Sequence, residues 1–274
     1  MKVNDIRNKK IYESFDKYYL KDVKLLMNLK KKFIEINCPC CSNKNYNTEF
    51  KKNGFNFVRC GFCNTLFVNP RPTIDMLEDF YRNSETIKFF AEKILKASEE
   101  KRRQTIFKPR VQKVIELCEK FKTNRRLLVN IGAGNGIFCA EMMNSRFFEC
   151  VLAVEPSDDM ANECRKKNIP VLNDMIEQCI LKNIDVITNF ELLEHLFEPG
   201  VFLKACAEKL KKNGLMIITT VCIEGFDLSI LGKFSDNIRA PQHLNYFSKK
   251  GIRILFEKSG FSIIEILTPG KLDV

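Results

Sequence analysis

The pattern of apolar positions changes in character at residue 127. From there on, short apolar runs alternate with stretches in which apolar residues recur at helical spacing. The runs predict strands at 127–131, 150–155, 169–172, 184–189, 214–220 and 261–267. The stretches between them predict helices at 136–145, 158–167, 174–181, 199–211 and 248–259. This alternation predicts an α/β fold, with a doubly wound and mostly parallel sheet.

The N-terminal half has a more helical pattern. Residues 1–36 predict a charged amphipathic helix, because apolar side chains recur there at helical spacing. A short strand after residue 65 ends at two prolines, and Thr73 is suited to cap a helix that begins at Ile74. Residues 74–122 then predict further helices, with a break at 83–86 and a new helix start at Pro109.

Two cysteine pairs precede these helices. The chain reads Cys38-Pro-Cys-Cys41 and then, after 18 intervening residues, Cys60-Gly-Phe-Cys63. Each C-x-x-C pair places two thiolates on one side of a tight turn, so two pairs complete a tetrahedral zinc site. Cys40 is a spare thiol that could replace Cys38 or Cys41, although the spacing favours the other four. Because four thiolates leave no open position for water, we expect a structural Zn²⁺ and not a catalytic one.

These patterns divide the chain into four parts. We expect an N-terminal helical segment at 1–36, a zinc ribbon at 37–72, linking helices at 73–123 and an α/β domain at 124–274. The linking helices would connect the ribbon to the sheet and could cover its active site.

A glycine-rich turn follows the first strand of the α/β domain. The stretch Leu127–Gly136 reads LLVNIGAGNG, an apolar run that leads into glycines at alternate positions. Glycine permits unusual backbone angles and lets a ligand approach the chain closely. The next strand ends in Glu155, 19 residues after Gly136, where βαβ nucleotide sites bind ribose hydroxyls. A dinucleotide fingerprint would need a third glycine one place after Gly136, where this chain has Ile137.

Composition narrows the cellular context and the partners. The net charge of +11 is spread along the chain, and no block of like charge is longer than the three lysines at 30–32. This diffuse pattern favours solvated lysines over a nucleic-acid surface. No apolar run has the length of a membrane span, and residues 1–15 lack the apolar core of a signal peptide. We therefore expect a cytoplasmic protein that does not bind a membrane.

Several motifs together resemble one enzyme superfamily. The G-x-G-x-G spacing is similar to the first motif of class I S-adenosylmethionine-dependent methyltransferases, and residues 185–199, DVITNFELLEHLFEP, resemble their fourth-strand motif. The segment Cys38–Pro72 resembles the zinc ribbon of nucleotide-sugar C-methyltransferases and of relatives from surface-polysaccharide pathways. Residues 240–248, APQHLNYFS, look like the segment that enters the last crossover helix of that family. The resemblance implies a Rossmann-like methyltransferase sheet, S-adenosylmethionine as cofactor and a structural Zn²⁺.

The resemblance also implies which residues hold the cofactor. This set comprises Asn130, Gly132, Ala133, Gly134, Gly136, Glu155, Pro156, Asp174, Phe190 and Glu191. Asn130 stands where the family normally has an acid, so we expect weaker cofactor affinity. Asp174 is the candidate for the adenine-contacting acid, and Asn173 competes with it.

Methyl transfer to most acceptors also requires removal of a proton. The chain has two histidines, and His243 lies in the loop 221–245 that should cover the substrate. We predict His243 as the general base, the alternative being that it only pins the loop. For His195 an orienting role is favoured. The candidate substrate contacts, each of which also fits simple packing, are Tyr81, Glu194, His195, Phe226, Asp227, Asn245 and Tyr246.

The sequence ends at Val274, directly after the sixth predicted strand. The antiparallel seventh strand that completes such sheets has no sequence left, so we expect a C-terminal truncation. The leading hypothesis is methyl transfer to a small molecule, in particular a nucleotide-linked sugar. The alternatives are an RNA methyltransferase whose ribbon binds RNA and, third, an inactive binding module. The acceptor atom and the oligomeric state stay open.

Overall fold

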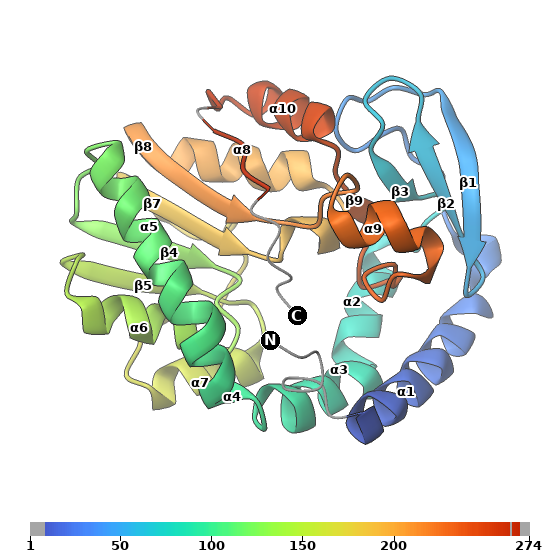
Figure 1. Ribbon diagram of the computed structural model, residues 1–274, viewed down its shortest axis with the longest axis horizontal. Coiled ribbons are helices and arrows are strands. Elements are labelled where there is room, and N and C mark those ends of the chain that lie inside the picture. Colours follow the sequence, from blue (N-terminus) through green and yellow to red (C-terminus); the bar gives the residue numbers. More distant parts are fainter. Residues whose placement is uncertain (1–8, 264, 269–274) are drawn as a thin grey trace.

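The computed structural model describes residues 9–263 and 265–268 (Figure 1). Its larger sheet has five strands in the order β6-β5-β4-β7-β8, and every neighbouring pair is parallel. The strands are β4 (Leu127–Ile131), β5 (Cys150–Val154), β6 (Val171–Leu172), β7 (Ile184–Phe190) and β8 (Leu210–Thr219). The predicted α/β fold with a parallel sheet is confirmed. The order reverses beside β4, so a ligand is expected at the carboxyl ends of β4 and β7.

Helices cover both faces of this sheet. One core cluster joins α5 (Lys108–Lys120), α6 (Ile137–Ser145) and α7 (Asp158–Lys166) to strand residues such as Leu128. A second cluster joins α8 (Pro199–Lys209) and α10 (Lys249–Lys258) to strand residues such as Val129. Successive strand residues point to opposite faces, so this alternation gives a doubly wound arrangement.

Two predicted elements of the α/β domain are wrong. Residues 174–181 form only a turn, in which the Cys179 amide donates to the Met175 carbonyl oxygen. One turn is enough to bury both Ile176 and Cys179. No strand forms at 261–267 among its described residues. Phe261 and Ile263 instead pack against the core beside α10, so their hydrophobicity serves packing and not strand pairing.

The predicted ribbon contains a small antiparallel sheet in the order β1-β2-β3-β9. Its strands are β1 (Tyr46–Lys52), β2 (Phe55–Cys60), β3 (Leu66–Val68) and β9 (Asn245–Tyr246). The last strand comes from the far end of the α/β domain and pairs with β3. Close by, the Ser248 hydroxyl donates to the Cys63 carbonyl oxygen. The ribbon cysteines also share a core cluster with the parallel sheet, so ribbon and α/β domain form one packed body.

The linking segment is helical, as predicted. It consists of α2 (Ile74–Asn83), α3 (Glu85–Phe89), the π-helical η3 (Phe90–Leu95), α4 (Glu99–Arg102), the π-helical η4 (Arg103–Phe107) and α5. Thr73 caps α2 by accepting a hydrogen bond from the Met76 amide, and Ser84 caps α3 at the predicted break. Pro109 lies in the first turn of α5, as expected from its missing N–H.

The N-terminal helix α1 (Lys9–Met27) packs on the linking helices; the short η2 (Lys30–Lys32) follows it. The buried Asp22 carboxylate accepts hydrogen bonds from the Ser84 hydroxyl and from the amide and hydroxyl of Thr86. A buried carboxylate needs such partners, so Asp22 fixes α1 to the α2–α3 junction. Within the described part of the chain, no helix combines the length and the hydrophobicity that crossing a membrane requires.

Arg71 holds the ribbon against the α/β domain. Its side chain is fully buried, and burial lowers the pKa of its guanidinium. It donates to the carbonyl oxygens of Val68 and Phe197 at 3.1 and 3.2 Å and to Asn245 Oδ1 at 3.0 Å. One side chain therefore connects β3, the turn before α8 and β9.

We expect Arg71→Ala to lower the free energy of unfolding by about 3 kcal/mol, because it leaves a cavity and removes the donor to the buried Val68 carbonyl oxygen and to the part-buried Phe197 carbonyl oxygen. Urea denaturation measures this change. The control is Arg59→Ala, which removes a half-exposed pair with Glu49 and should cost less than about 1 kcal/mol. Equal losses in both variants would contradict the bridging role of Arg71.

Candidate active site and metal centre

The glycine-rich turn lies between β4 and α6, at the carboxyl edge of the sheet (Figure 1). Gly132, Gly134 and Gly136 have φ angles of +68°, +55° and +78°, a region that disfavours residues with a Cβ. A Cβ at Gly136 would lie 2.5 Å from Ile169 Cδ1, so this glycine is required for packing. A Cβ at Gly134 would meet no described atom within 4 Å. Gly134 is therefore the position at which a ligand can approach the backbone.

Glu155 braces this turn from the end of β5. One carboxylate oxygen accepts a hydrogen bond from the Gly134 amide at 2.7 Å, and the other accepts one from the Ser157 amide at 3.0 Å. Burial raises the pKa of Glu155, while the two backbone N–H groups act in the opposite direction. Each carboxylate oxygen keeps a further lone pair, so Glu155 can still accept from a ribose hydroxyl. That contact stays a prediction.

The other candidate cofactor residues lie in different environments. Asn130 is buried in β4, and its side-chain oxygen accepts from the Thr188 hydroxyl at 2.9 Å. Asp174 accepts from the Met175 amide, while Asn173 donates to the carbonyl oxygens of Glu155 and Pro156. The arrangement thus ties Asn173 to the end of β5 and gives Asn130 a partner inside the sheet.

The end of β7 carries Phe190 and Glu191, and Ala133 lies across the edge in the glycine-rich turn. The Phe190 ring packs at 4.7 Å against Phe138 of α6, and Arg110 of α5 stacks over it at 4.4 Å. Glu191 is exposed and accepts from the Thr219 hydroxyl at 2.5 Å. Phe190 is therefore an apolar side chain packed against α5 and α6, and its contact with a cofactor stays a prediction.

The structure brings both histidines together. The rings of His195 and His243 lie 4.8 Å apart at 75°. Nδ1 of His243 contacts the Asn237 carbonyl oxygen at 2.8 Å, and Nδ1 of His195 contacts that of Gln242 at 2.7 Å. A carbonyl only accepts, so each neutral ring carries its proton on Nδ1 and keeps a lone pair on Nε2. This is the tautomer that a proton acceptor at Nε2 needs.

Two further groups complete this cluster. Ligand atoms of Glu194, His195 and His243 all lie within 4.8 Å of one another. Tyr81, from α2, donates its hydroxyl to the Gln242 carbonyl oxygen at 3.2 Å and lies 3.3 Å from Nδ1 of His195. Glu194 is fully buried: one oxygen accepts from the Thr220 hydroxyl at 2.7 Å, and no described group pairs with the other. The cluster therefore brings an acid and two bases together, with Glu194 buried and both histidines half-buried.

Burial sets the ionisation of this cluster. Desolvation, followed by the neighbouring His195, lowers the pKa of His243 to about 3. Burial likewise lowers the pKa of His195 and raises that of Glu194. The charged form of each group is disfavoured in such surroundings, so both imidazoles are neutral at neutral pH.

This ionisation predicts a loss of stability in acid. Below pH 6.5 the unfolded chain protonates His243, whereas the native chain does not until about pH 3. The unfolded state then binds more protons, so the free energy of unfolding falls as pH decreases through this window. Between pH 7 and 5 we expect wild type to lose about 2 kcal/mol more than His243→Asn. Urea denaturation at both pH values tests this, and parallel losses would contradict it.

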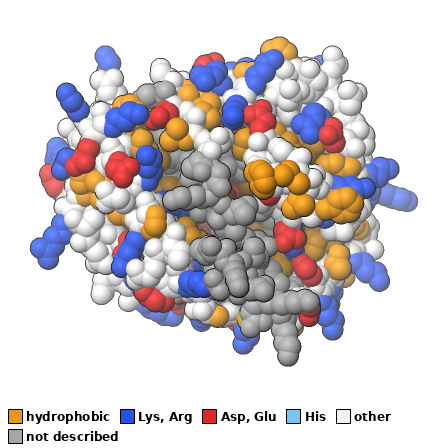
Figure 2. All heavy atoms as spheres, viewed as in Figure 1, with side chains coloured by type: hydrophobic (Ala, Val, Ile, Leu, Met, Phe, Trp, Pro, Cys, Tyr) orange, Lys and Arg blue, Asp and Glu red, His pale blue; other side chains and the backbone are white. Residues whose placement is uncertain are grey.

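Of the remaining substrate candidates, Tyr246 lies beside His243: their ring centroids are 6.1 Å apart, and both side chains contact the Asn237 carbonyl oxygen. Asn245 and Tyr246 are fully buried in β9, where Asn245 donates to the Leu196 carbonyl oxygen. Asp227 accepts from Ser235 and Asn237 within its own loop. Phe226 of α9 (Phe226–Leu231) is 73% exposed, in an apolar surface that includes Ile230 and, in the following η6 (Gly232–Phe234), Phe234 (Figure 2). These positions favour packing roles for Asn245 and Tyr246.

A comparison with known protein families identifies the domain that carries the glycine-rich turn and the histidines. The family described as a methyltransferase domain matches residues 84–266, about two thirds of the chain. The chain belongs to this methyltransferase domain family. The match begins in the linking helices and contains the glycine-rich turn, Glu194, both histidines and every strand of the parallel sheet.

Individual curated proteins match shorter parts of the chain than the family does. A ubiquinone biosynthesis O-methyltransferase of Bradyrhizobium diazoefficiens is 31% identical over 132 residues, 42% of this chain and 51% of the relative. A mitochondrial enzyme of the same name from Schizosaccharomyces pombe is 35% identical over 105 residues, 34% of this chain and 37% of the relative. The chain thus spans about half the length, or less, of these two curated relatives.

Solved structures resemble the chain in fold. One is an S-adenosylmethionine-dependent methyltransferase from Clostridium acetobutylicum, with 15% identity and a TM-score of 0.48. That comparison covers 59% of this chain and 83% of the solved structure.

The four paired cysteines in front of the methyltransferase domain form a compact cluster. Sγ atoms of Cys38, Cys41, Cys60 and Cys63 all lie within 4.8 Å of one another, and the Cys38–Cys63 and Cys41–Cys60 pairs are 3.5 Å apart. A Zn–S bond of about 2.3 Å gives tetrahedron edges of about 3.8 Å. The residues present therefore fit a tetrahedral zinc ion.

Cys40 lies outside this set of four. Its buried Sγ accepts from the Thr65 hydroxyl at 3.4 Å, although it belongs to the same knuckle as Cys38 and Cys41. The spacing argument for the other four thiols agrees with this geometry.

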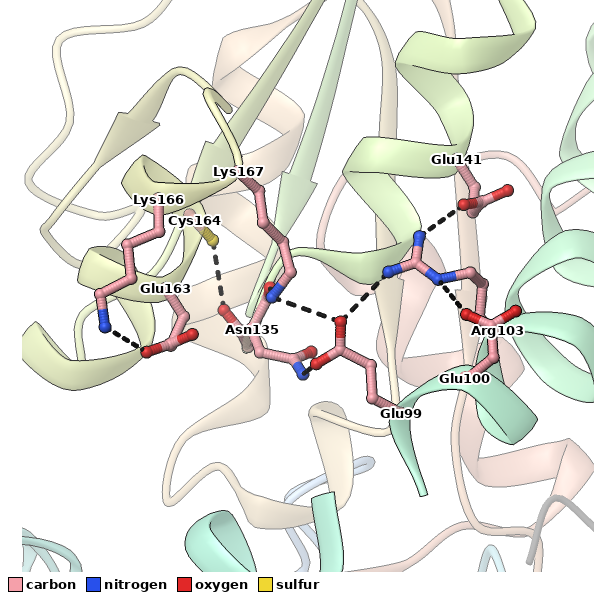
Figure 3. A network of polar contacts seen from close by, with 10 residues as sticks. Glu99, Glu100, Arg103, Asn135, Glu141, Glu163, Cys164, Lys166 and Lys167 are labelled. Atoms are coloured by element: carbon pink, nitrogen blue, oxygen red, sulfur yellow. Dashed lines mark hydrogen bonds and ion pairs between the residues drawn. The ribbon is translucent and has the colours of Figure 1, made fainter. Parts of the chain in front are cut away.

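The sequence did not point to the polar residues that surround the glycine-rich turn. Asn135, inside the turn, donates to Glu99 of α4, and Lys167 donates to the Asn135 carbonyl oxygen (Figure 3). Asn135 occupies a variable position of the G-x-G-x-G pattern, and Glu99 lies in the charged linking segment. Neither position carries a local signal of function.

Proposed function

We propose that this protein is an S-adenosylmethionine-dependent methyltransferase that acts on a small-molecule acceptor. The observation that carries the proposal is the turn at Gly134, which is open to a ligand, braced by Glu155 and contained in a methyltransferase domain. Backbone N–H groups at the start of α6 and the Glu155 carboxylate would contact the cofactor. Phe190 would line the site beside them.

When bound, S-adenosylmethionine supplies a methyl group on a sulfonium centre, an excellent leaving group. The protein's tasks are then to align the acceptor and to remove its proton. We assign proton removal to Nε2 of His243, whose lone pair is left free by the Nδ1 contact to Asn237. Tyr81 and His195 lie next to it and can hold the acceptor's polar groups. Glu194, buried within the same cluster, would favour the protonated imidazole electrostatically when ionised.

For the acceptor, we propose a nucleotide-linked sugar. The motifs that support this choice are the cysteine-paired ribbon with its FVNPRP tail and the APQHLNYFS segment. Arg71 of the first motif bonds Asn245 of the second, so the two motifs support each other in space. A second candidate is a hydroxyl-bearing acceptor, because the curated relatives are named O-methyltransferases. We also infer one structural Zn²⁺, held by Cys38, Cys41, Cys60 and Cys63.

A transfer assay with methyl-labelled S-adenosylmethionine tests the function. Purified protein is offered nucleotide sugars, hydroxylated quinone precursors and total RNA in separate reactions. We expect label in the nucleotide-sugar fraction. Label in the quinone precursors alone would favour the hydroxyl-bearing acceptor over the nucleotide-linked sugar. Label in RNA would overturn both small-molecule proposals. Calorimetric titration with S-adenosylmethionine serves as the parallel measurement, and absence of binding would overturn the methyltransferase proposal itself.

A further inference from the structure

A polar network joins the linking helices to the glycine-rich turn (Figure 3). Its centre is Glu99, in the short helix α4. One carboxylate oxygen of Glu99 accepts from the Asn135 side chain at 3.2 Å. The other accepts from Arg103 at 3.1 Å and lies 3.6 Å from the Lys167 ammonium. One carboxylate thus contacts the turn, the residue that follows α7 and the first residue of η4.

The partners of Glu99 are themselves anchored around the same turn. Lys167 donates to the Asn135 carbonyl oxygen at 2.9 Å, so both the side chain and the backbone of Asn135 are held. Arg103 forms an ion pair of 2.6 Å with Glu141 of α6, the helix that follows the turn. The side chains of Glu99, Arg103 and Lys167 are only 28%, 21% and 21% exposed. Solvent and salt screen such pairs less than fully exposed ones.

The turn needs this support because of its own geometry. Asn135 lies between two glycines that both have positive φ, and glycine loses more conformational entropy on ordering than any other residue. A ligand that had to order the turn on binding would lose affinity by that cost. Contacts that hold the turn in place before binding remove this loss.

We propose that Glu99 is a positioning residue for the cofactor site: by holding Asn135, Lys167 and Arg103 it preorganises the Gly132–Gly136 turn and makes cofactor affinity depend on the linking helices. The inference rests on the proposed function of this turn as the S-adenosylmethionine site. By linkage, a bound cofactor stabilises α4 as much as an ordered α4 strengthens cofactor binding. The linking helices are therefore part of the cofactor site although they lie outside the sheet.

Glu99→Ala and Glu99→Gln test the proposal, with Glu100→Ala as the matched control. Glu100 is 72% exposed and pairs with the same Arg103, and among the described contacts it reaches no residue of the turn. We expect Glu99→Ala to raise the Kd for S-adenosylmethionine about tenfold, while kcat at saturating cofactor stays within twofold. Glu99→Gln should give a smaller rise, because its amide oxygen still accepts from Asn135 without the charge. Glu100→Ala should bind as wild type does.

Hydrogen exchange of the Gly132–Gly136 amides without cofactor separates this inference from the proposed function. We expect faster exchange there in Glu99→Ala than in Glu100→Ala, with an equal thermal midpoint of unfolding. If wild type fails to bind S-adenosylmethionine, the proposed function is overturned, and the exchange still decides the role of Glu99. If wild type binds and Glu99→Ala shows unchanged Kd and exchange, the positioning role is overturned. A lower thermal midpoint with unchanged exchange in the turn would also overturn it, in favour of general stabilisation.

Discussion

Replacing Cys60 with serine should abolish zinc binding and leave the protein without a stable ribbon. Cys60 is fully buried and lies in the four-thiol cluster. A structural zinc contributes about 10–16 kcal/mol of apparent binding free energy in small zinc-binding peptides. Domains of ordinary stability have only about 5–15 kcal/mol in total, so even part of this loss exceeds what the fold can tolerate.

The effect should extend beyond the ribbon. Cys60 belongs to the same core cluster as Val129 and Ile187 of the parallel sheet, and β3 pairs with β9 of the α/β domain. We therefore expect chelator-treated wild type and Cys60→Ser to share a lowered thermal midpoint and exposed apolar surface. Elemental analysis should find one zinc per chain in wild type and none in the variant.

Two other cysteines provide controls for this experiment. Cys150 is exposed and remote in sequence from the cluster, so Cys150→Ser should keep both zinc and stability. Cys40→Ser should also keep the metal, because the Cys40 thiol bonds Thr65 and lies outside the tetrahedral set. A Cys60→Ser protein with full zinc content and an unchanged midpoint would refute the metal site.

Features that depend on interactions between residues close in the chain could be predicted from the sequence, whereas features that depend on distant residues could not. The strands of the parallel sheet and the cap at Thr73 depend on neighbours within a few residues, and both are present in the structure. The pairing of Phe67 with Asn245 joins residues that are far apart in the chain. No local pattern marks a two-residue strand, so a loop was the natural expectation for 245–246.

The two wrong elements have the same origin. The period of Ile176 and Cys179 fits a helix, but one turn already buries both side chains before β7 begins. The apolar run after residue 260 fits a strand, but packing against the core beside α10 covers its side chains without strand pairing. Burial can be read from a sequence more reliably than the backbone form that achieves it.

For the candidate site, the types of residue indicated which side chains could act in catalysis, but the sequence did not show which side chains contact one another. The proximity of His195, His243 and Tyr81 follows from the fold, because they come from η5 (Leu193–His195), the loop before β9 and α2. The sequence suggested each of them singly and could not show that their rings and hydroxyl meet. Glu99 was missed for the converse reason: its contacts are made only after the linking helices pack against the turn.

Removing the His243 imidazole should reduce methyl transfer by about 10²–10⁴-fold, the range that general acid–base groups contribute. His243→Asn is the informative variant, because its amide N–H can still donate to the Asn237 carbonyl oxygen that Nδ1 of the histidine contacts. The loop contact is then kept and only the proton acceptor is lost. The Kd for S-adenosylmethionine should stay within about threefold of wild type, since the glycine-rich turn is untouched.

A double-mutant cycle with Glu194 distinguishes a base from a structural histidine in the same assay. The pKa of His243 is about 3, so the free protein keeps this imidazole neutral throughout pH 5–8, and its own ionisation should not appear in kcat/KM over that range. A pKa this low makes the ring a weak base. Proton transfer to it therefore needs either a methyl acceptor whose own proton is acidic or an ionised Glu194 carboxylate that favours the imidazolium. Glu194→Gln should then lower kcat in wild type and have little further effect in His243→Asn, whereas independent losses would assign the two residues to separate roles. Full activity in His243→Asn would leave the histidine as a loop contact alone.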